Sequence, residues 1–186
     1  MRAMIFALLL CPVAVHAAPA TYVLETQKSA VGFEADFGSN TITGKMPVTR
    51  ADLTLDFTAL SRSKIAVILD ISGAQASFPF ATQAMKGPKM LDADRHPEIS
   101  FVSTSLTGTI DGAEVKGRLT LRGVTHPVVL HAVLYRQQGF AAGDTSHLTI
   151  LLTGEVLRSA YGATGWADMV GDSVRLRILA RIARVD

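Results

Sequence analysis

Apolar and polar residues alternate one by one through long stretches of this chain. The most regular runs are residues 31–37, 51–57, 64–71, 115–122 and 173–182. A period of two puts one set of side chains on one face of a β-sheet and the other set on the opposite face. In a helix the same residues would form no apolar stripe, so these runs predict strands. Less regular runs also predict strands at residues 97–103, 127–135 and 148–157.

Glycine, asparagine and aspartate residues separate the runs, as is typical of turns between strands. The segment 79–94 breaks the alternation, and Pro79 followed by residues 80–86 predicts one or two helical turns that end at Gly87. No repeat or linker divides residues 18–186. We therefore predict one all-β domain, a single eight-stranded antiparallel barrel with a short helical insertion. A barrel is favoured over a sandwich because one face is apolar throughout the best strands.

The first 17 residues have the pattern of a cleaved signal peptide. Arg2 provides the positive charge, an apolar run follows, and small residues around Ala17 suit cleavage there. The run is shorter than the roughly 18–20 apolar residues of a transmembrane helix. A buried N-terminal helix and acylation at Cys11 are the alternatives, and Leu10 is unsuited to precede an acylation site. We expect the domain at residues 18–186 to be exported to a bacterial periplasm.

The composition excludes several classes of protein. The 186 residues are 48% hydrophobic and carry a formal net charge of +2, which is atypical of a nucleic-acid-binding or polybasic membrane module. Cys11 is the single cysteine, so no disulfide can form within the chain. No apolar segment after residue 17 reaches the length of a transmembrane helix.

Residues that carry catalytic or metal chemistry are scattered. No two of the histidines at positions 96, 126, 131 and 147 are spaced for metal binding on a helix, so we predict no metal site. The segment 171–174 resembles the nucleophile block of a hydrolase family, but it lies near the end of the chain, where we interpret it as a turn. There is no G-x-S-x-G elbow and no phosphate-binding loop. The sequence therefore favours a protein that is not an enzyme and has no cofactor.

Cations and methionines gather around the predicted helix. Lys86, Lys89 and Arg95 form either a solvated face or an anion site at a barrel mouth. Met85 and Met90 lie beside them in the sequence, and methionines suit adaptable apolar surfaces. Trp166 in the glycine-rich segment 162–171 either caps the barrel or lines its opening.

Three blocks of the chain together resemble one protein family. Residues 90–104 contain a proline that leads into an I-x-F-x-S-T strand, residues 115–128 resemble the pattern G-x-L-T-x-x-G-V-T-x-P-V, and residues 157–162 resemble R-S-D-F-G. These patterns are similar to those of the YceI-like proteins, which are bacterial polyisoprenoid-binding proteins with a lipocalin-like barrel. Ala160 departs from the pattern, which has an aspartate there. Residues 94–96 depart from it as well.

The resemblance implies a periplasmic protein that binds or carries a long-chain apolar lipid, such as a polyisoprenoid, a quinone-like tail or a fatty amide. The alternatives are an enzyme that acts on such a lipid and a ligand-free structural or stress-response protein. Small residues on the inward faces would leave room for a ligand: Ala35, Ala51, Gly117 and Ala180. The lipid would be the partner, and a homodimer is possible.

The expected ligand-binding residues fall into two groups. The predicted contacts to the apolar tail are Phe33, Phe37, Leu55, Phe57, Leu69, Met85, Met90, Phe101, Leu119, Leu121 and Trp166. The predicted contacts to a head group are Lys86, Lys89 and Arg95.

Overall fold

Strands dominate the computed structural model of this protein, which describes residues 18–141 and 143–185. The predicted signal peptide, residues 1–17, lies outside the described residues. The strands are β1 (Ala20–Leu24), β2 (Ala30–Phe37), β3 (Asn40–Met46), β4 (Val48–Leu55), β5 (Lys64–Asp70), β6 (Gln75–Ala76), β7 (Glu98–Thr109), β8 (Gly112–Leu121), β9 (Val124–Arg136), β10 (His147–Leu157) and β11 (Val170–Arg184). The helical segments are α1 (Pro79–Lys86) and the 3-10 turns η1 (Thr26–Lys28), η2 (Leu60–Arg62) and η3 (Arg158–Tyr161).

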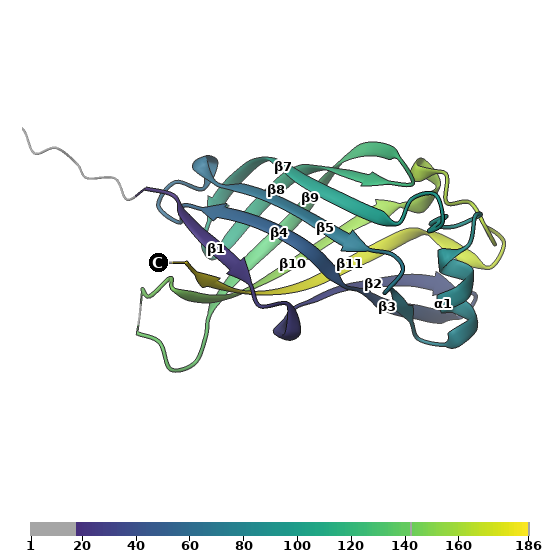
Figure 1. Ribbon diagram of the computed structural model, residues 1–186, viewed down its shortest axis with the longest axis horizontal. Helices are drawn as coiled ribbons and strands as arrows, with labels where there is room; N and C mark the ends of the chain where they lie inside the picture. Colours follow the sequence, from purple (N-terminus) through teal and green to yellow (C-terminus); the bar gives the residue numbers. More distant parts are fainter. Residues whose placement is uncertain (1–17, 142, 186) are drawn as a thin grey trace, which may run out of the picture.

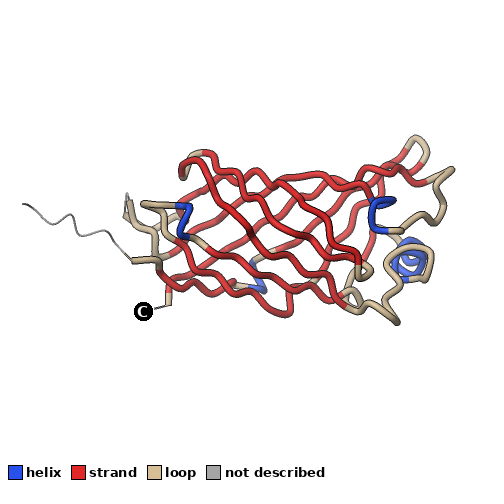
Figure 2. The backbone as a smooth tube through the Cα atoms, turned by 90° about the horizontal axis from the view of Figure 1, so that it is seen from above, coloured by secondary structure: helices blue, strands red, loops and turns tan. Residues whose placement is uncertain are grey.

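The sheet closes into a barrel whose strands are all antiparallel to their neighbours (Figures 1 and 2). Eight strands follow one another around the ring in the order β1, β4, β5, β7, β8, β9, β10 and β11. Pairing of β1 with β11, for example Tyr22 with Arg184, completes the ring. The predicted all-β barrel with one short helical insertion is confirmed.

Three of the barrel strands are interrupted, which explains why eleven segments build an eight-stranded ring. Both β1 and β2 pair with β11, and η1 separates them. Pro47 separates β3 from β4, because proline has no N–H for a sheet hydrogen bond. The short strand β6 follows β5 along the chain and pairs with β3. The sequence analysis did not predict these interruptions.

The alternating runs place their apolar residues inside the barrel, as expected. On β11, Leu176 and Ile178 face the interior whereas Arg177 is exposed. One end of the barrel, far from α1 in Figure 1, is filled by a packed cluster of side chains. The buried members of this cluster are Tyr22, Leu53, Leu55, Leu148 and Ile182.

The helix α1 and two long connections cover the opposite end of the barrel (Figures 1 and 2). Pro79 occupies the first turn of α1, where a missing N–H is tolerated, and Gly87 ends the helix. Backbone hydrogen bonds fold the chain after α1 back onto it, including Leu91 N–H to the Met85 carbonyl at 2.9 Å. The predicted helical turns are therefore confirmed, and the helix begins one residue earlier than expected, at Pro79.

Candidate ligand-binding cavity

The barrel interior contains an elongated cavity of about 330 Å³. This volume lies within the range of about 300–1,000 Å³ that is usual for small-molecule sites. Residues from every described strand and from α1 form the wall, and almost all are apolar. Polar side-chain atoms come only from Ser29, Arg158, Tyr161 and Trp166 among the described wall residues.

The wall includes every residue that the sequence analysis assigned to tail binding. These are Phe33, Phe37, Leu55, Phe57, Leu69, Met85, Met90, Phe101, Leu119, Leu121 and Trp166. Strand residues reach the wall because a period of two puts alternate side chains inside the barrel. Their contact with a ligand stays a prediction.

Three of the four small residues predicted to leave room for a ligand do line the cavity, and Gly117 does not. Ala35, Ala51 and Ala180 belong to the wall. A Cβ atom on Gly117 would meet the Phe101 ring at 2.3 Å, so this ring already fills the space above the glycine. Phe33 lies over Gly44 in the same way, at 2.2 Å from the position of a Cβ atom. Each glycine allows a phenylalanine ring to lie close to the sheet.

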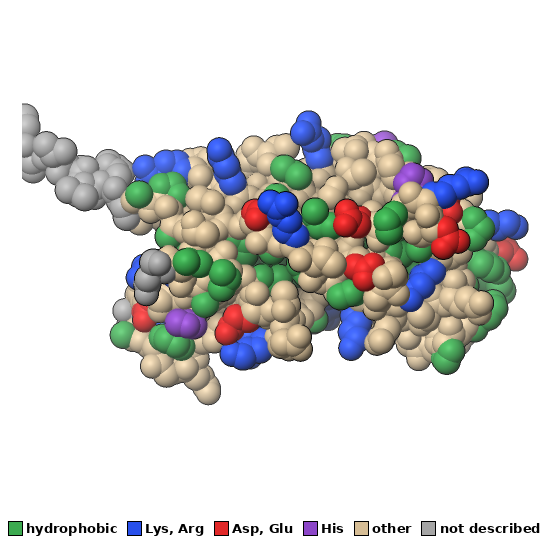
Figure 3. Space-filling model, in the orientation of Figure 1, with side chains coloured by type: hydrophobic (Ala, Val, Ile, Leu, Met, Phe, Trp, Pro, Cys, Tyr) green, Lys and Arg blue, Asp and Glu red, His purple; other side chains and the backbone are tan. Residues whose placement is uncertain are grey.

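The cavity opens at the end of the barrel that carries α1. Phe78, Phe80 and Met169 belong to the wall and are also exposed, with 64% of Phe80 accessible. Apolar surface is visible at this end of the molecule in Figure 3. The rings of Phe80 and Trp166 meet edge to face, with centroids 6.5 Å apart. Trp166 therefore lines the opening and also helps to cap it. Leu179, on β11, is a further exposed residue of the wall.

The predicted head-group cations lie outside the cavity wall. The Lys86 ammonium group donates a hydrogen bond to the Ser72 carbonyl oxygen. The Arg95 side chain is 81% exposed, and its Nη1 atom lies 3.9 Å from the Asp92 carboxylate. Lys89 is exposed, and its carbonyl accepts a hydrogen bond from Gly165 N–H. A role of these three residues in head-group binding stays a prediction.

A buried arginine in the wall, Arg158, was missed in the sequence analysis. Its guanidinium group donates hydrogen bonds to the carbonyl oxygens of Gly165 and Gly171, both at 2.9 Å, and of Val170 at 2.7 Å. It also bonds to the carbonyl of Ala163. Arg158 thus holds the segment 163–171 across the end of the barrel. The arginine of the R-S-D-F-G pattern was the available signal.

Tyr161 belongs to the same turn as Arg158, η3, and is also buried. Its ring meets the His126 ring edge to face, with centroids 5.1 Å apart. The Asp172 carboxylate holds the same turn to β11, since it accepts hydrogen bonds from Ser159 N–H at 2.9 Å and from Ser159 Oγ at 2.7 Å. These bonds lower the pKa of Asp172.

The sequence analysis interpreted the segment 171–173 as a turn before a strand. In the structure this segment lies within β11, where the pairing with β2 is irregular.

The described residues contain no group of three or more His, Cys, Asp or Glu side chains that could hold a metal ion. None of the helices in the described part of the chain is long and apolar enough to cross a membrane.

The fold and the cavity define a class of protein: closed antiparallel β-barrels that enclose an apolar cavity. Within this class, the chain belongs to the YceI-like family, because the profile of the YceI-like domain matches residues 22–182. The family resemblance inferred from the sequence is confirmed.

Relatives and solved structures agree with this assignment. A UPF0312 protein of Shewanella oneidensis is 26% identical over 185 residues, which cover 93% of this chain and 96% of that protein. A UPF0312 protein of Vibrio parahaemolyticus is 27% identical over 117 residues, and the match spans only 62% of its length. BcnA of Burkholderia cenocepacia superposes with a TM-score of 0.76 at 18% identity, covering 86% of this chain and 99% of that chain. A polyisoprenoid-binding domain of Saccharophagus degradans superposes with a TM-score of 0.63 at 11% identity, covering 89% and 99%.

Proposed function

We propose that this protein binds one long-chain apolar lipid inside its barrel and carries it through the periplasm. The observation that supports this most strongly is an elongated cavity with an almost wholly apolar wall. Burial of each CH₂ group stabilises a complex by about 0.8 kcal/mol, so a long tail can bind tightly with few polar contacts. A polyisoprenoid, a quinone-like tail or a fatty amide has the required chemistry.

Two further findings support the proposal. The chain belongs to the YceI-like family, and one structural neighbour is described as a polyisoprenoid-binding domain. The periplasmic location rests on the signal-peptide pattern of residues 1–17.

The ligand would enter at the α1 end. The opposite end is filled by a cluster that includes Tyr22 and Ile182, and these residues are only 3% and 1% exposed. At the α1 end the exposed wall residues Phe78, Phe80 and Met169 offer a tail an apolar path into the cavity. A protein that binds and releases its ligand unchanged needs such an opening and no catalytic groups.

Solvent extraction of the purified protein followed by mass spectrometry tests the proposal. We expect a long-chain lipid at a ratio approaching one per chain. Ala51→Leu would fill part of the cavity, because Ala51 is a wall residue, and should reduce the lipid recovered. Ala66→Leu is the matched control, since Ala66 pairs with Asp52 on the neighbouring strand and lies outside the wall. Absence of lipid from the wild type, together with failure to take up any added lipid, would contradict the proposal.

A further inference from the structure

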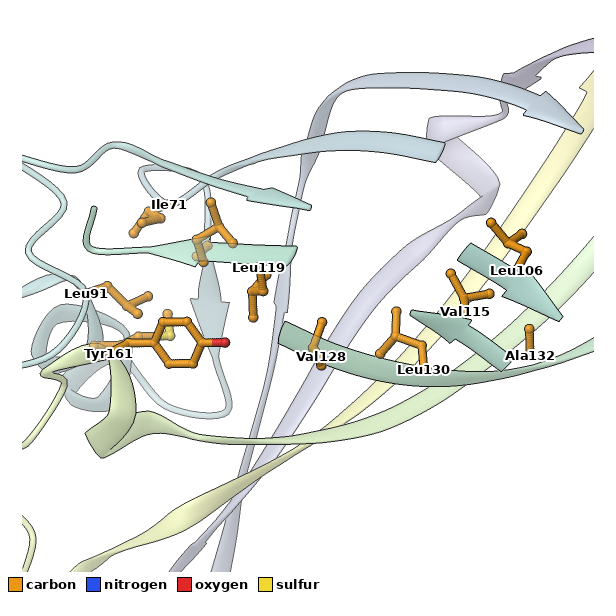
Figure 4. Close-up of a cluster of buried hydrophobic side chains, with 12 residues drawn as sticks. Ile71, Leu91, Leu106, Val115, Leu119, Val128, Leu130, Ala132 and Tyr161 are labelled. Carbon is orange, nitrogen blue, oxygen red and sulfur yellow. The ribbon is translucent and has the colours of Figure 1, made fainter. Parts of the chain in front are cut away.

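Tyr161 places a hydroxyl group inside the apolar cavity. The residue belongs to η3, is only 3% exposed, and packs in the same buried cluster as Leu91 and Leu119. Figure 4 shows its hydroxyl pointing from the turn into the barrel interior, toward Leu119 and Val128. Tyr161 is thus a polar group directed at the space that a ligand would occupy.

This hydroxyl has no hydrogen-bond partner among the residues that the structure describes. The other polar wall side chains differ from it. Ser29 Oγ bonds to the Glu25 carbonyl at 2.9 Å, and Arg158 bonds to several carbonyls. Trp166 is half-buried at the mouth of the cavity, where water can reach it. Among the described wall residues, Tyr161 therefore combines a buried side chain with a hydroxyl that faces the cavity and makes no hydrogen bond to the protein.

The hydroxyl faces the cavity, so an apolar ligand that filled this space would leave it without a partner unless the ligand supplied an acceptor. Burial raises the pKa of Tyr161, which keeps the phenol protonated and able to donate. The R-S-D-F-G pattern has phenylalanine at this position, and phenylalanine would fill the same space without a donor. Packing alone does not account for the oxygen atom.

The surroundings favour an acceptor oxygen. Arg158, from the same turn, is a buried cation whose hydrogen bonds go to carbonyl groups, and no carboxylate of the described residues lies within ion-pair distance of it. Its charge contributes to the lowered pKa of Asp172, so it already favours negative charge in this region. A full negative charge is disfavoured, because the neighbouring wall is apolar and the Arg158 hydrogen bonds are already made.

We propose that the Tyr161 hydroxyl donates a hydrogen bond to a neutral carbonyl oxygen of the bound lipid. The polar group of the ligand then lies inside the barrel beside η3, and not outside at Lys86 and Lys89. The ligand class narrows to lipids whose long tail ends in an amide, ester or quinone carbonyl. This inference rests on the proposed function of lipid binding.

The test compares probes with the same tail in displacement of the dye N-phenyl-1-naphthylamine. Oleamide carries a carbonyl group, cis-9-octadecene has no polar group, and oleate carries a charge. We expect Tyr161→Phe to weaken oleamide binding by about three- to tenfold, as loss of one neutral hydrogen bond does, and to leave octadecene unchanged. Tyr135→Phe is the matched control, because Tyr135 is 52% exposed on β9 and lies outside the wall.

A second measurement separates ligand binding from a structural role. The melting temperature of ligand-free Tyr161→Phe should equal or exceed that of the wild type, because no protein hydrogen bond is lost. A lower melting temperature, or equal losses for oleamide and octadecene, would overturn the proposal. A greater loss for oleate than for oleamide would overturn the neutral acceptor. If no probe binds the wild type, the proposed function fails, and this inference fails with it.

Discussion

At the scale of single residues, a side chain's direction on a strand decides its effect on stability. Leu176 faces the cavity and Arg177, its neighbour on β11, faces solvent. Leu176→Asp would place an unpaired charge against an apolar wall, so we expect a loss of about 3 kcal/mol or more in the free energy of unfolding. Arg177→Asp should change it by about 0.5 kcal/mol at most. Urea denaturation of both variants checks this, and equal losses would show that the two faces were assigned wrongly.

A second residue-scale prediction concerns Asp56, a buried carboxylate. The Thr58 hydroxyl donates to it at 2.7 Å, Thr58 N–H at 2.9 Å and Ala59 N–H at 3.0 Å. The hydrogen bond from the Thr58 side chain is the largest cause that lowers the pKa of Asp56, and Arg62 contributes as well. A lowered pKa means that the folded state favours the charged form.

Asp56 therefore contributes stability above its unfolded pKa of about 3.9, and this contribution is lost as the pH falls through the lower folded pKa. We expect thermal unfolding curves between pH 2 and pH 7 to show a smaller acid-side loss of stability for Asp56→Asn than for the wild type. Asp52→Asn is the control, since Asp52 is exposed and its ion pair with Arg50 lies on the surface. An unchanged pH dependence for Asp56→Asn would contradict the assignment.

At the scale of strands and turns, the sequence predicts the wall better than it predicts the ends of the barrel. Alternation alone determines which face of a strand is apolar, and residues such as Phe33 and Leu119 accordingly lie on the cavity wall. The ends depend on contacts between distant segments, for example the bonds from Arg158 to the carbonyls of residues 163–171. No periodicity encodes such contacts. The cations near α1 lie outside the cavity wall, and whether they form a solvated face or an anion site at the barrel mouth stays a prediction.

Packing between neighbouring strands gives an element-scale prediction. Gly117 on β8 lies under the Phe101 ring of β7, so a Cβ atom at this position would overlap the ring. We expect Gly117→Ala to destabilise the barrel by about 1–3 kcal/mol, measured by urea denaturation, because the ring must move. It should also reduce lipid uptake, since the displaced ring enters the cavity.

Two variants make this test specific. Gly112→Ala is the matched control, because a Cβ atom on Gly112 would meet nothing within 4 Å. Adding Phe101→Leu to Gly117→Ala should restore part of the lost stability, since the smaller side chain leaves space for the new methyl group. If the double variant is as unstable as the sum of the single variants, the loss has another origin than this contact.

At the scale of the whole molecule, the barrel is packed at one end and open at the other. The packed cluster that includes Tyr22 and Ile182 closes the first end. At the second end, the cavity wall continues to the surface at Phe78, Phe80 and Met169. Ligand affinity and ligand exchange should therefore depend on different residues. The interior sets the area buried against the tail, whereas the rim sets the barrier that a tail crosses on entry and exit.

The last prediction separates these two properties. Phe80→Ser would remove an exposed apolar side chain from the mouth, so we expect slower transfer of a fluorescent fatty amide from phosphatidylcholine vesicles to the protein. The amount bound at equilibrium should change little, because most of the tail would lie against interior residues of the wall such as Leu119 and Leu176. Val124→Ser is the control, since Val124 is exposed on β9 and does not line the cavity. Stopped-flow fluorescence gives the rate and titration gives the affinity. An unchanged rate for Phe80→Ser would mean that the ligand enters elsewhere, and the exposed wall residue Leu179 would be the next position to vary.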